Sequence, residues 1–333
     1  MSILLPVFNA AASLEACLQS LARQTLREFE IVVVDDGSSD ASTEILKRWK
    51  ARESRLRLIR QPHEGLIPAL NHGLGLCRAP LVARMDADDI AHPKRLERQV
   101  TLLDDRPGVA VVSCLVKCFP RREVAQGFRL YEEWINGLTS HDDMARELFV
   151  ESPVAHPSVV FRKEPVQRLG GYRDCAWPED YDLWLRLFED GAVFAKVGEC
   201  LFFWRERGDR LSRTDERYSI LSFLRCKAHF LCRGPVAAPA RVVVWGAGIT
   251  GRRLTRFLLA EGAQIEAIVD IDPSKIGRML HGLPIISADS LADFLREQTI
   301  VIAAVASRGA RKLIRERLQS LGLVEGKSFW CAA

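Results

Sequence analysis

The 333-residue sequence has no apolar run near the roughly 18 residues that a membrane-spanning helix needs. It also lacks a basic start followed by an apolar stretch, which is the pattern of a secretory signal. Its nine cysteines form no Cys-x-x-Cys pair, and their number is odd. We therefore expect a cytoplasmic protein with buried, reduced thiols, and we expect neither disulfides nor a zinc site.

The sequence also lacks a strong excess of either charge. It has 47 Lys and Arg against 43 Asp and Glu, and residues 240–333 carry the whole excess of +4. There is no basic stripe of the kind that binds nucleic acid, so we predict no nucleic-acid partner. The mildly basic C-terminal part fits a solvated helix face better than an anionic-ligand site.

Short β-branched segments alternate with segments of helical period in the first ninety residues. This alternation predicts an α/β fold with a parallel sheet between helices, in which ligands bind at the carboxyl ends of the strands. The pattern is less regular up to residue 215. Strands are predicted at 2–7, 30–34, 56–60, 81–85, 109–116 and 157–161, and helices at 12–23 with Ser13 as N-cap, 42–53, 67–77, 144–149, 181–188 and 217–232.

A Pro- and Ala-containing stretch at 233–240 has the composition of a linker, and the βα pattern restarts after it. We predict three parts: a first domain at 1–216, a helix and linker at 217–239, and a small second domain at 240–333. The second domain is predicted to hold strands at 241–245, 264–269 and 299–305 and helices at 249–261, 291–297 and 308–321.

Asp86 and Asp88 flank one alanine directly after a predicted strand. Two carboxylates at this spacing can converge on one hard cation, and oxygen ligands suit Mg²⁺ or Mn²⁺. The alternative is a solvated acidic turn.

Two more acidic pairs occupy similar places. Asp35 and Asp36 end the predicted strand 30–34, where a carboxylate can accept from a ribose hydroxyl or a base NH, while nearby residues cap the next helix. Glu179 and Asp180 begin the predicted helix 181–188. Taken alone, that second pair is explained by the positive end of the helix dipole.

In this order, the three clusters and the segments around them resemble the family 2 inverting glycosyltransferases of the GT-A fold. The resemblance spans roughly residues 2–215. It rests on Ile3-Leu-Leu-Pro-Val-Phe-Asn-Ala10, Gln24-Thr25, Phe29-Glu-Ile-Val-Val-Val-Asp-Asp-Gly-Ser-Ser-Asp40, Gly65-Leu66, Ala69-Leu-Asn71, Ala83-Arg-Met-Asp-Ala-Asp-Asp89, Arg95-Leu-Glu-Arg-Gln99, His156-Pro-Ser158 and Glu179-Asp180. The family often has Asn where this chain has His63.

The resemblance implies transfer of a sugar from a nucleotide-diphospho-sugar to an acceptor hydroxyl, and a UDP-sugar is the donor we favour. The implied acceptor is a glycan or a lipid-linked molecule in cell-surface polysaccharide synthesis. It implies Mn²⁺ or Mg²⁺ on Asp88 and Asp86. Asp180, with Glu179 beside it, is the implied catalytic base, and His156 lies on the acceptor side. The implied donor-binding residues are Pro6, Asn9, Asp35, Asp36, Asn71, Asp86, Arg205 and Ser212.

The second domain carries Gly246-x-Gly248-x-x-Gly251 after a predicted strand, and Asp270 ends the next strand. This spacing is typical of a dinucleotide-binding turn with a ribose-binding acid. All four tyrosines precede residue 240, which excludes a dehydrogenase with a Tyr–Lys pair. The domain resembles small Rossmann-like domains that accompany sugar-modifying enzymes. A nucleotide ligand and a structural or dimerising role remain equal alternatives.

The two-domain layout, with Trp134-Ile-Asn136 and Trp245-Gly-Ala-Gly-Ile-Thr-Gly-Arg-Arg253, resembles proteins named β-1,3-N-acetylglucosaminyltransferase-like. Two other functions compete with an active transferase: a non-catalytic nucleotide-sugar-binding or scaffolding protein, and an oxidoreductase using the second domain. The basic, partly apolar helix 217–232 fits packing between the domains better than peripheral contact with the inner face of a membrane. A homo-oligomer is left open.

Overall fold

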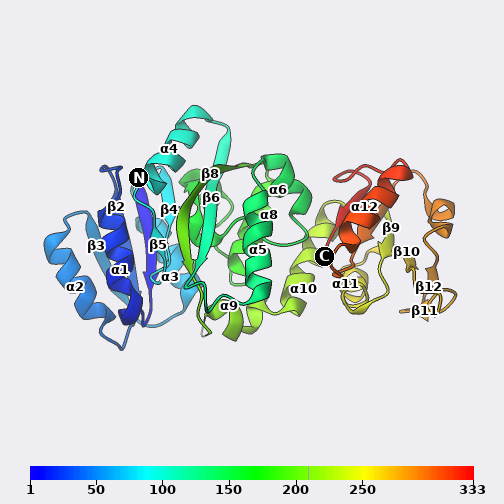
Figure 1. Cartoon of the computed structure of the whole chain (residues 1–333), viewed down its shortest axis with the longest axis horizontal. Helices are drawn as coiled ribbons and strands as arrows, with labels where there is room; N and C mark the ends of the chain where they lie inside the picture. The colour runs from blue at the N-terminus through cyan, green and yellow to red at the C-terminus, as the bar shows by residue number, and fades with distance from the viewer. Residues whose placement is uncertain (209) are drawn as a thin grey trace. The chain divides into compact units, whose positions relative to one another are not determined.

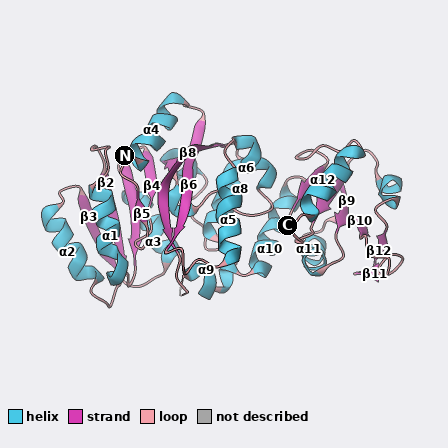
Figure 2. Cartoon of the chain, in the orientation of Figure 1, coloured by secondary structure: helices cyan, strands magenta, loops and turns pink. Residues whose placement is uncertain are grey.

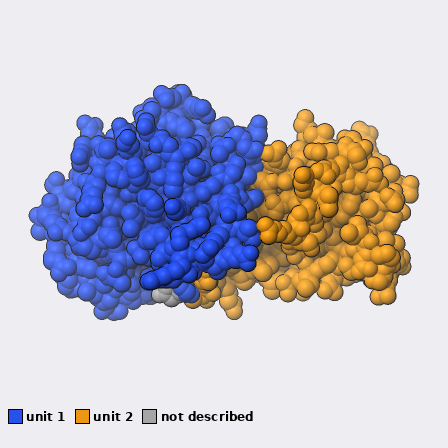
Figure 3. All heavy atoms as spheres, in the orientation of Figure 1, with its two compact units in different colours: residues 1–144, 153–175, 179–210 blue, residues 145–152, 176–178, 211–333 orange. Residues whose placement is uncertain are grey.

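The computed structural model describes residues 1–208 and 210–333 (Figure 1). The chain forms two compact units, shown in different colours in Figure 3. Unit 1 comprises Met1–Met144, Pro153–Cys175 and Glu179–Arg210, and unit 2 comprises Ala145–Ser152, Ala176–Pro178 and Leu211–Ala333. Each unit is built on its own sheet flanked by helices (Figure 2).

The first half of the unit 1 sheet is parallel, in the order β3-β2-β1-β4. Successive residues of β1 point to opposite faces, so Ile3 and Leu5 pack with α1 and α2 while Leu4 packs with α3. Both faces are thereby buried, which explains why these strands are almost uniformly apolar. The elements are β1 (Ser2–Val7), α1 (Ala11–Ala22), β2 (Glu30–Asp36), α2 (Ser42–Arg52), β3 (Leu56–Gln61), α3 (Leu66–Leu76) and β4 (Leu81–Arg84).

The second half of this sheet is mixed, in the order β4-β7-β6-β8-β5. β7 is antiparallel to both neighbours, β6 and β8 are parallel, and β5 is antiparallel to β8. The elements are β5 (Ile90–Ala91), α4 (Arg95–Asp105), β6 (Val109–Phe119), α5 (Gln126–Gly137), α6 (His141–Glu147), η1 (His156–Ser158), β7 (Val160–Arg162), α7 (Lys163–Arg168), α8 (Glu179–Glu189) and β8 (Val193–Arg205).

Several local predictions for unit 1 were wrong. Ser13 lies inside α1, whose N-cap is Ala10, and its hydroxyl donates instead to the backbone of Ala87, 3.1 Å away. The strand predicted at 157–161 begins only at Val160, because His156–Ser158 forms a 3₁₀ turn. The sequence patterns also missed α4, α5 and β8.

Unit 2 contains a sheet in the order β11-β12-β10-β9-β13-β14, parallel except at β11–β12. The helix predicted at 291–297 is wrong, because the chain there forms the short 3₁₀ turn η3 (Ser290–Phe294). The other elements are α9 (Leu211–Thr214), η2 (Glu216–Tyr218), α10 (Ile220–Arg233), β9 (Arg241–Trp245), α11 (Ile249–Ala260), β10 (Gln264–Val269), β11 (Met279–Leu280), β12 (Leu283–Ile286), β13 (Thr299–Ala303), α12 (Ala310–Ser320) and β14 (Phe329–Cys331).

Helix α10, which we grouped with the predicted linker, is an integral part of unit 2. It packs on α11, with the Cys232 thiol 4.0 Å from the carbonyl of Leu258 and the His229 ring 3.4 Å from the Glu261 carboxylate. As limits of independently folding domains, residues 216 and 239 stay predictions. In the described part of the chain, every helix is too short or too polar to cross a bilayer.

Lys196 on β8 is 7% exposed, and its ammonium donates to the backbone carbonyls of Ile135 and Pro153. Burial lowers the pKa of Lys196 to about 8. Since an unfolded lysine keeps its proton up to about pH 10.4, the unfolded state binds more protons between these values. The free energy of unfolding should therefore rise with pH in this window.

We expect Lys196→Met to remove this rise, which is worth about 3 kcal/mol at full extent. Urea unfolding of both proteins at pH 7.5 and pH 10 measures the change in the free energy of unfolding. The cysteines and tyrosines that also titrate in this range are present in both proteins, so the difference between the two reports on Lys196. Equal pH dependence in the two proteins would contradict the assignment.

Candidate active site

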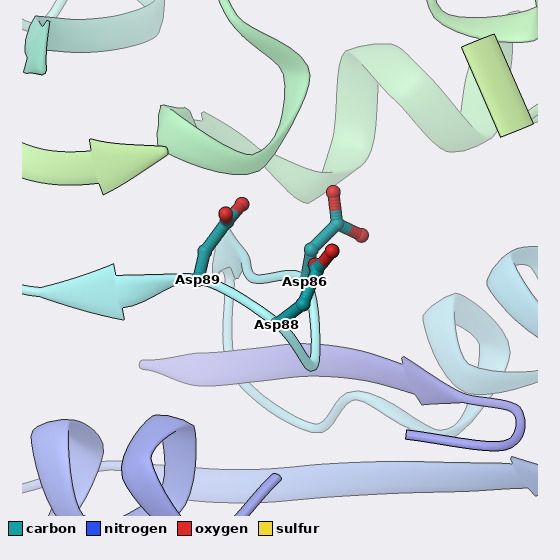
Figure 4. A group of neighbouring side chains, drawn as sticks. All are labelled: Asp86, Asp88 and Asp89. Carbon is teal, nitrogen blue, oxygen red and sulfur yellow. The ribbon is translucent and has the colours of Figure 1, made fainter. Parts of the chain in front are cut away.

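Three carboxylates gather on the loop that follows β4. Asp86, Asp88 and Asp89 each offer an oxygen, and these oxygens lie within 4.8 Å of one another. Figure 4 shows the three side chains projecting to the same side of the loop. The structure therefore brings together the two residues predicted from the sequence and adds Asp89.

This crowding makes the cluster unfavourable without a cation. Burial raises the pKa of Asp88, and the neighbouring Asp86 raises it further. Burial, with Asp88 and Asp86 beside it, raises the pKa of Asp89 well above its usual range. Within the described residues, Oδ2 of Asp89 is buried without a hydrogen-bond partner. A hard divalent cation would offset this repulsion, and Oδ2 of Asp89 could coordinate it. The cluster therefore fits Mn²⁺ or Mg²⁺.

Two buried arginines, Arg84 and Arg95, support this loop. Arg84, 1% exposed, donates to the carboxylate of Asp86 at 2.6 Å and to the carbonyl of Met85. Arg95, fully buried, donates to the carbonyl of Arg84 at 2.8 Å, and burial lowers its pKa to about 10. These charge-assisted hydrogen bonds connect the end of β4 and the acidic loop to two buried guanidiniums.

Arginines from the end of β8 reach the same loop. The backbone NH of Arg205 donates to Asp89 at 2.7 Å, and its Nε donates to the carbonyl of Asp88 at 2.6 Å. Its guanidinium also stacks on Phe119, so Arg205 fastens β8 to the acidic loop. Arg207, 38% exposed, lies 3.3 Å from the Asp88 carboxylate and is a cation that the sequence analysis missed.

Asp36 and Asp35, at the end of β2, hold the neighbouring loops. The Asp36 carboxylate accepts from the backbone NH groups of Glu64 and Gly65 and contacts His63 at 2.8 Å. The Asp35 carboxylate is fully buried and accepts from the NH of Ser38.

Phe8 and Asn9 are two exposed residues of this region. The Phe8 ring, 44% exposed, stacks on His63 with centroids 3.9 Å apart. Asn9 has a φ of 47°, and its side-chain oxygen accepts from the NH of Ser39. Pro6 is buried within β1. The residue that departs from the family pattern, His63, thus lies against the carboxylate expected to contact the nucleotide.

Asn71 connects α3 to the segment before α8. It donates to the carbonyl of Tyr172 at 2.7 Å and accepts from the Tyr172 NH at 2.9 Å. A Cβ added to Gly171 would lie 2.6 Å from the Asn71 side chain, so the glycine allows this close approach. Asn71 therefore acts on the backbone here.

Tyr172 joins the acidic loop electrostatically to the start of α8. Burial raises its pKa, Arg84 opposes this, and Glu179, Asp180 and Asp86 raise it further. The predicted base Asp180 and the predicted metal ligand Asp86 thus both raise the pKa of Tyr172. Asp180 is half-buried and its Oδ1 accepts from the Tyr181 NH, whereas Glu179 is 2% exposed.

His156 is 7% exposed and lies 2.8 Å from the Tyr172 hydroxyl. Burial, and then Arg84, lowers the pKa of His156 well below its usual range, so the ring stays neutral. The ring supports Tyr172 rather than opening to solvent. The other predicted donor residue, Ser212, lies in α9, and its side chain is outside the described part of the structure.

The glycine turn of unit 2 precedes α11 as predicted. A Cβ on Gly251 would lie 1.8 Å from the carbonyl of Gly246, and Gly246 has a φ of 130°, whereas Gly248 faces open space. The Asp270 carboxylate accepts from the NH of Ala247 and from Lys275, which ties the end of β10 to this turn. These glycines are explained by close backbone packing, and a ligand remains the open alternative.

The family described as Glycosyl transferase family 2 matches residues 2–170, and the family described as CoA binding domain matches residues 238–323. The amylovoran biosynthesis glycosyltransferase AmsE of Erwinia amylovora is 34% identical over 218 residues, covering 64% of this chain and 78% of AmsE. The Escherichia coli UDP-Gal:alpha-D-GlcNAc-diphosphoundecaprenol beta-1,3-galactosyltransferase is 25% identical over 232 residues, covering 69% of this chain and 82% of that enzyme.

Among solved structures, Staphylococcus aureus TarS 1–349 in complex with UDP-GlcNAc shares the fold, with a TM-score of 0.54 at 17% identity over 78% of this chain and 70% of that one. The mannosyltransferase PcManGT from Pyrobaculum calidifontis, in complex with GDP-Man and Mn²⁺, gives 0.50 at 21% identity over 69% and 61%. The predicted GT-A fold and the Rossmann-like second part are confirmed. The family match covers half of the chain and agrees with the relatives' names, so the chain belongs to glycosyl transferase family 2 and is a glycosyltransferase.

Proposed function

We propose that this enzyme transfers a sugar from a UDP-sugar to a hydroxyl of a glycan or lipid-linked acceptor in polysaccharide biosynthesis, with inversion at the anomeric carbon. The observation that carries the proposal is the cluster of Asp86, Asp88 and Asp89, whose carboxylate oxygens lie within 4.8 Å of one another. The names of AmsE and of the galactosyltransferase, which specify amylovoran biosynthesis and a UDP-Gal donor with a lipid-diphosphate-linked acceptor, support the substrate classes.

Asp86, Asp88 and Asp89 would hold Mn²⁺ or Mg²⁺, and a bound ion supplies positive charge where the leaving diphosphate gains negative charge. Arg207, the partly exposed cation at Asp88, is placed to bind the same diphosphate. Arg205 supports the loop instead, because its Nε is engaged with the carbonyl of Asp88.

The nucleotide would bind at the carboxyl ends of β1 and β2. Asn9 and the exposed Phe8 ring, stacked on His63, offer a polar edge and an aromatic face to the base and ribose. Asp36 orients His63 and the adjoining backbone, and Pro6 fixes the end of β1. We no longer assign Asp35 to the donor, because its carboxylate is fully buried and bonded to its own loop.

Asp180 would act as the base. It removes the proton of the acceptor hydroxyl while that oxygen forms a bond to the anomeric carbon, and the bond from this carbon to the diphosphate oxygen breaks with its electron pair going to the diphosphate. Because one displacement occurs from the face opposite the leaving group, the configuration inverts. Tyr172 and His156, whose side chains lie 2.8 Å apart, would act on Asp180 and Arg84 electrostatically and would not contact the reacting atoms.

A panel of UDP- and GDP-sugars tests this proposal. With Mn²⁺ present, we expect nucleotide release from one donor, and an acceptor glycan should accelerate that release. Nuclear magnetic resonance of the product should show an anomeric configuration opposite to that of the donor. Binding of donors in the absence of any turnover would replace the proposal by a non-catalytic binding role, and a product with retained configuration would overturn the single displacement.

Peripheral contact with the inner face of a membrane and a homo-oligomeric state stay open alternatives. The same is true of a nucleotide ligand at Gly246, Gly248, Gly251 and Asp270 in unit 2.

A further inference from the structure

Helix α1 of unit 1 carries a row of buried polar side chains. Ser13, Cys17 and Ser20 follow one another at helical spacing, and Gln24 lies four residues further, just beyond the end of the helix. All four are at most 7% exposed. A buried polar group without a partner costs free energy, and serine is a poorer helix former than alanine. Packing alone would favour apolar residues here, so the partners of these side chains explain them.

Two of the four side chains bind the backbone of the acidic loop itself. The hydroxyl of Ser13 donates to the carbonyl of Ala87 at 3.1 Å, and the thiol of Cys17 donates to the carbonyl of Asp86 at 3.3 Å. These carbonyls belong to the two residues that precede Asp88. Both bonds therefore hold the piece of backbone from which the predicted metal ligands project.

The other two side chains bind the chain that follows the loop. The Ser20 hydroxyl accepts from the NH of Ala91, which ends β5, at 3.1 Å. The Gln24 amide donates to the carbonyl of His92 at 2.9 Å and accepts from the NH of Leu96 on α4 at 3.1 Å. The whole stretch from the acidic loop to α4 is thus bonded to one row of side chains.

The acidic loop needs such bonds because its carboxylates repel one another. The side chains of Asp86, Asp88 and Asp89 project to the same side of the loop, and their oxygens lie within 4.8 Å of one another (Figure 4). Ionised carboxylates this close favour a backbone that moves them apart. Helix α1 can oppose that movement, because its apolar residues Leu14 and Leu18 are fully buried in the core of unit 1.

Building on the proposed metal role of the acidic cluster, we propose that Ser13 and Cys17 are positioning residues for the divalent cation. Their bonds to the carbonyls of Ala87 and Asp86 keep the loop in the geometry in which the carboxylates converge, so the ion binds without first drawing them together. Groups that orient metal ligands contribute about 10–100-fold to metal affinity. Loss of both donors should therefore weaken cation binding although every carboxylate remains.

The test measures Mn²⁺ binding to the full-length protein by electron paramagnetic resonance in the presence of UDP. Ser13→Ala combined with Cys17→Ala should raise the Kd for Mn²⁺ about 10-fold or more. Ser13→Ala combined with Cys17→Ser differs from it by one hydroxyl, which keeps a donor, and should bind Mn²⁺ about three-fold more tightly than the double alanine variant. Cys77→Ala removes a similarly buried thiol on the other face of the sheet and is the matched control.

Three outcomes of this titration would overturn the proposal. The first is wild-type Mn²⁺ affinity in the double alanine variant. The second is an equal loss whether residue 17 is alanine or serine, because a role in packing alone would not distinguish them. The third is a loss in Cys77→Ala as large as that in the double alanine variant, since any buried thiol would then have the same effect.

Hydrogen exchange of the metal-free protein, measured by mass spectrometry, gives a readout that depends on neither the ion nor turnover. The double alanine variant should exchange faster in the peptide covering residues 85–92 and at the wild-type rate in peptides from β2 and β3. Should the wild type bind no Mn²⁺, the proposed metal site fails, and the exchange pattern still decides whether α1 holds the loop. Unchanged exchange at 85–92, or faster exchange throughout unit 1, would reject the positioning role.

Discussion

Replacing Asp88 by Asn should lower kcat/KM for sugar transfer by about 10³-fold and remove its dependence on Mn²⁺. Asp88 lies at the centre of the acidic loop, with Asp86 and Asp89 around it and Arg207 beside it. An amide keeps the shape of the carboxylate but removes one of the charges that would hold the cation. Metal-assisted stabilisation of a leaving group is worth several kcal/mol, and each 1.36 kcal/mol is a factor of ten in rate.

The expected loss of activity does not come from unfolding, because Asp88→Asn removes the repulsion between the Asp88 and Asp86 carboxylates. With metal absent, the variant should unfold at a temperature equal to or above that of the wild type. Asp105→Asn, the same change on an exposed position of α4, is the matched control and should leave transfer unchanged. Electron paramagnetic resonance of Mn²⁺ in the presence of UDP measures ion binding directly. An Asp88→Asn variant with wild-type Mn²⁺ binding would place the ion elsewhere.

Asp180→Asn should reduce kcat by about 10²–10⁴-fold while UDP-sugar binding and Mn²⁺ binding persist. The asparagine cannot accept the proton of the acceptor hydroxyl, but it can still accept the hydrogen bond from the Tyr181 NH that the aspartate receives at 2.7 Å. The first turn of α8 should therefore keep its conformation. This separation of chemistry from binding distinguishes Asp180 from Asp88, whose loss affects both.

Steady-state kinetics with the donor found in the panel, together with calorimetric titration of UDP, measures the two effects. Asp190→Asn, just after α8, is a suitable control because Asp190 pairs with Arg168 at the protein surface and such pairs contribute about 0–1 kcal/mol. A fall in kcat matched by an equal loss of UDP affinity would assign Asp180 to donor binding instead of proton transfer.

The strands β1, β2 and β4 could be predicted from the sequence because each is a short apolar run that ends abruptly in polar residues. The same run-and-stop pattern located Asp86 and Asp88. Arg207 could not be located in this way, since its contact with Asp88 joins segments far apart in the sequence. This contact depends on the position of β8, a strand that the sequence pattern did not predict.

Burial and hydrogen bonding distinguish residues that the sequence motifs group together. Asp35 and Asp36 share a motif and a position at the end of β2, so the sequence does not distinguish them. In the structure, Asp35 points into the fold while Asp36 faces the loop at His63. Asn71 was predicted as a donor ligand because of its motif, yet both of its hydrogen-bonding ends are bound to the backbone of Tyr172. Side-chain direction within a motif is set by packing that the pattern does not contain.

The threading of Ala145–Ser152 and Ala176–Pro178 into unit 2 has a consequence for biosynthesis of the enzyme. A chain emerging from the ribosome presents these segments long before α10, α12 and β14 are made, and domains fold in the order in which they appear. Until α12 has been made, Glu147 lacks its partners Arg311 and Arg315, and until α10 has been made, Trp177 lacks its partner His229. Unit 2 is therefore completed only after α10 and α12 have been synthesised, so a polypeptide that ended before α10 would carry the acidic loop while both segments lacked their partners.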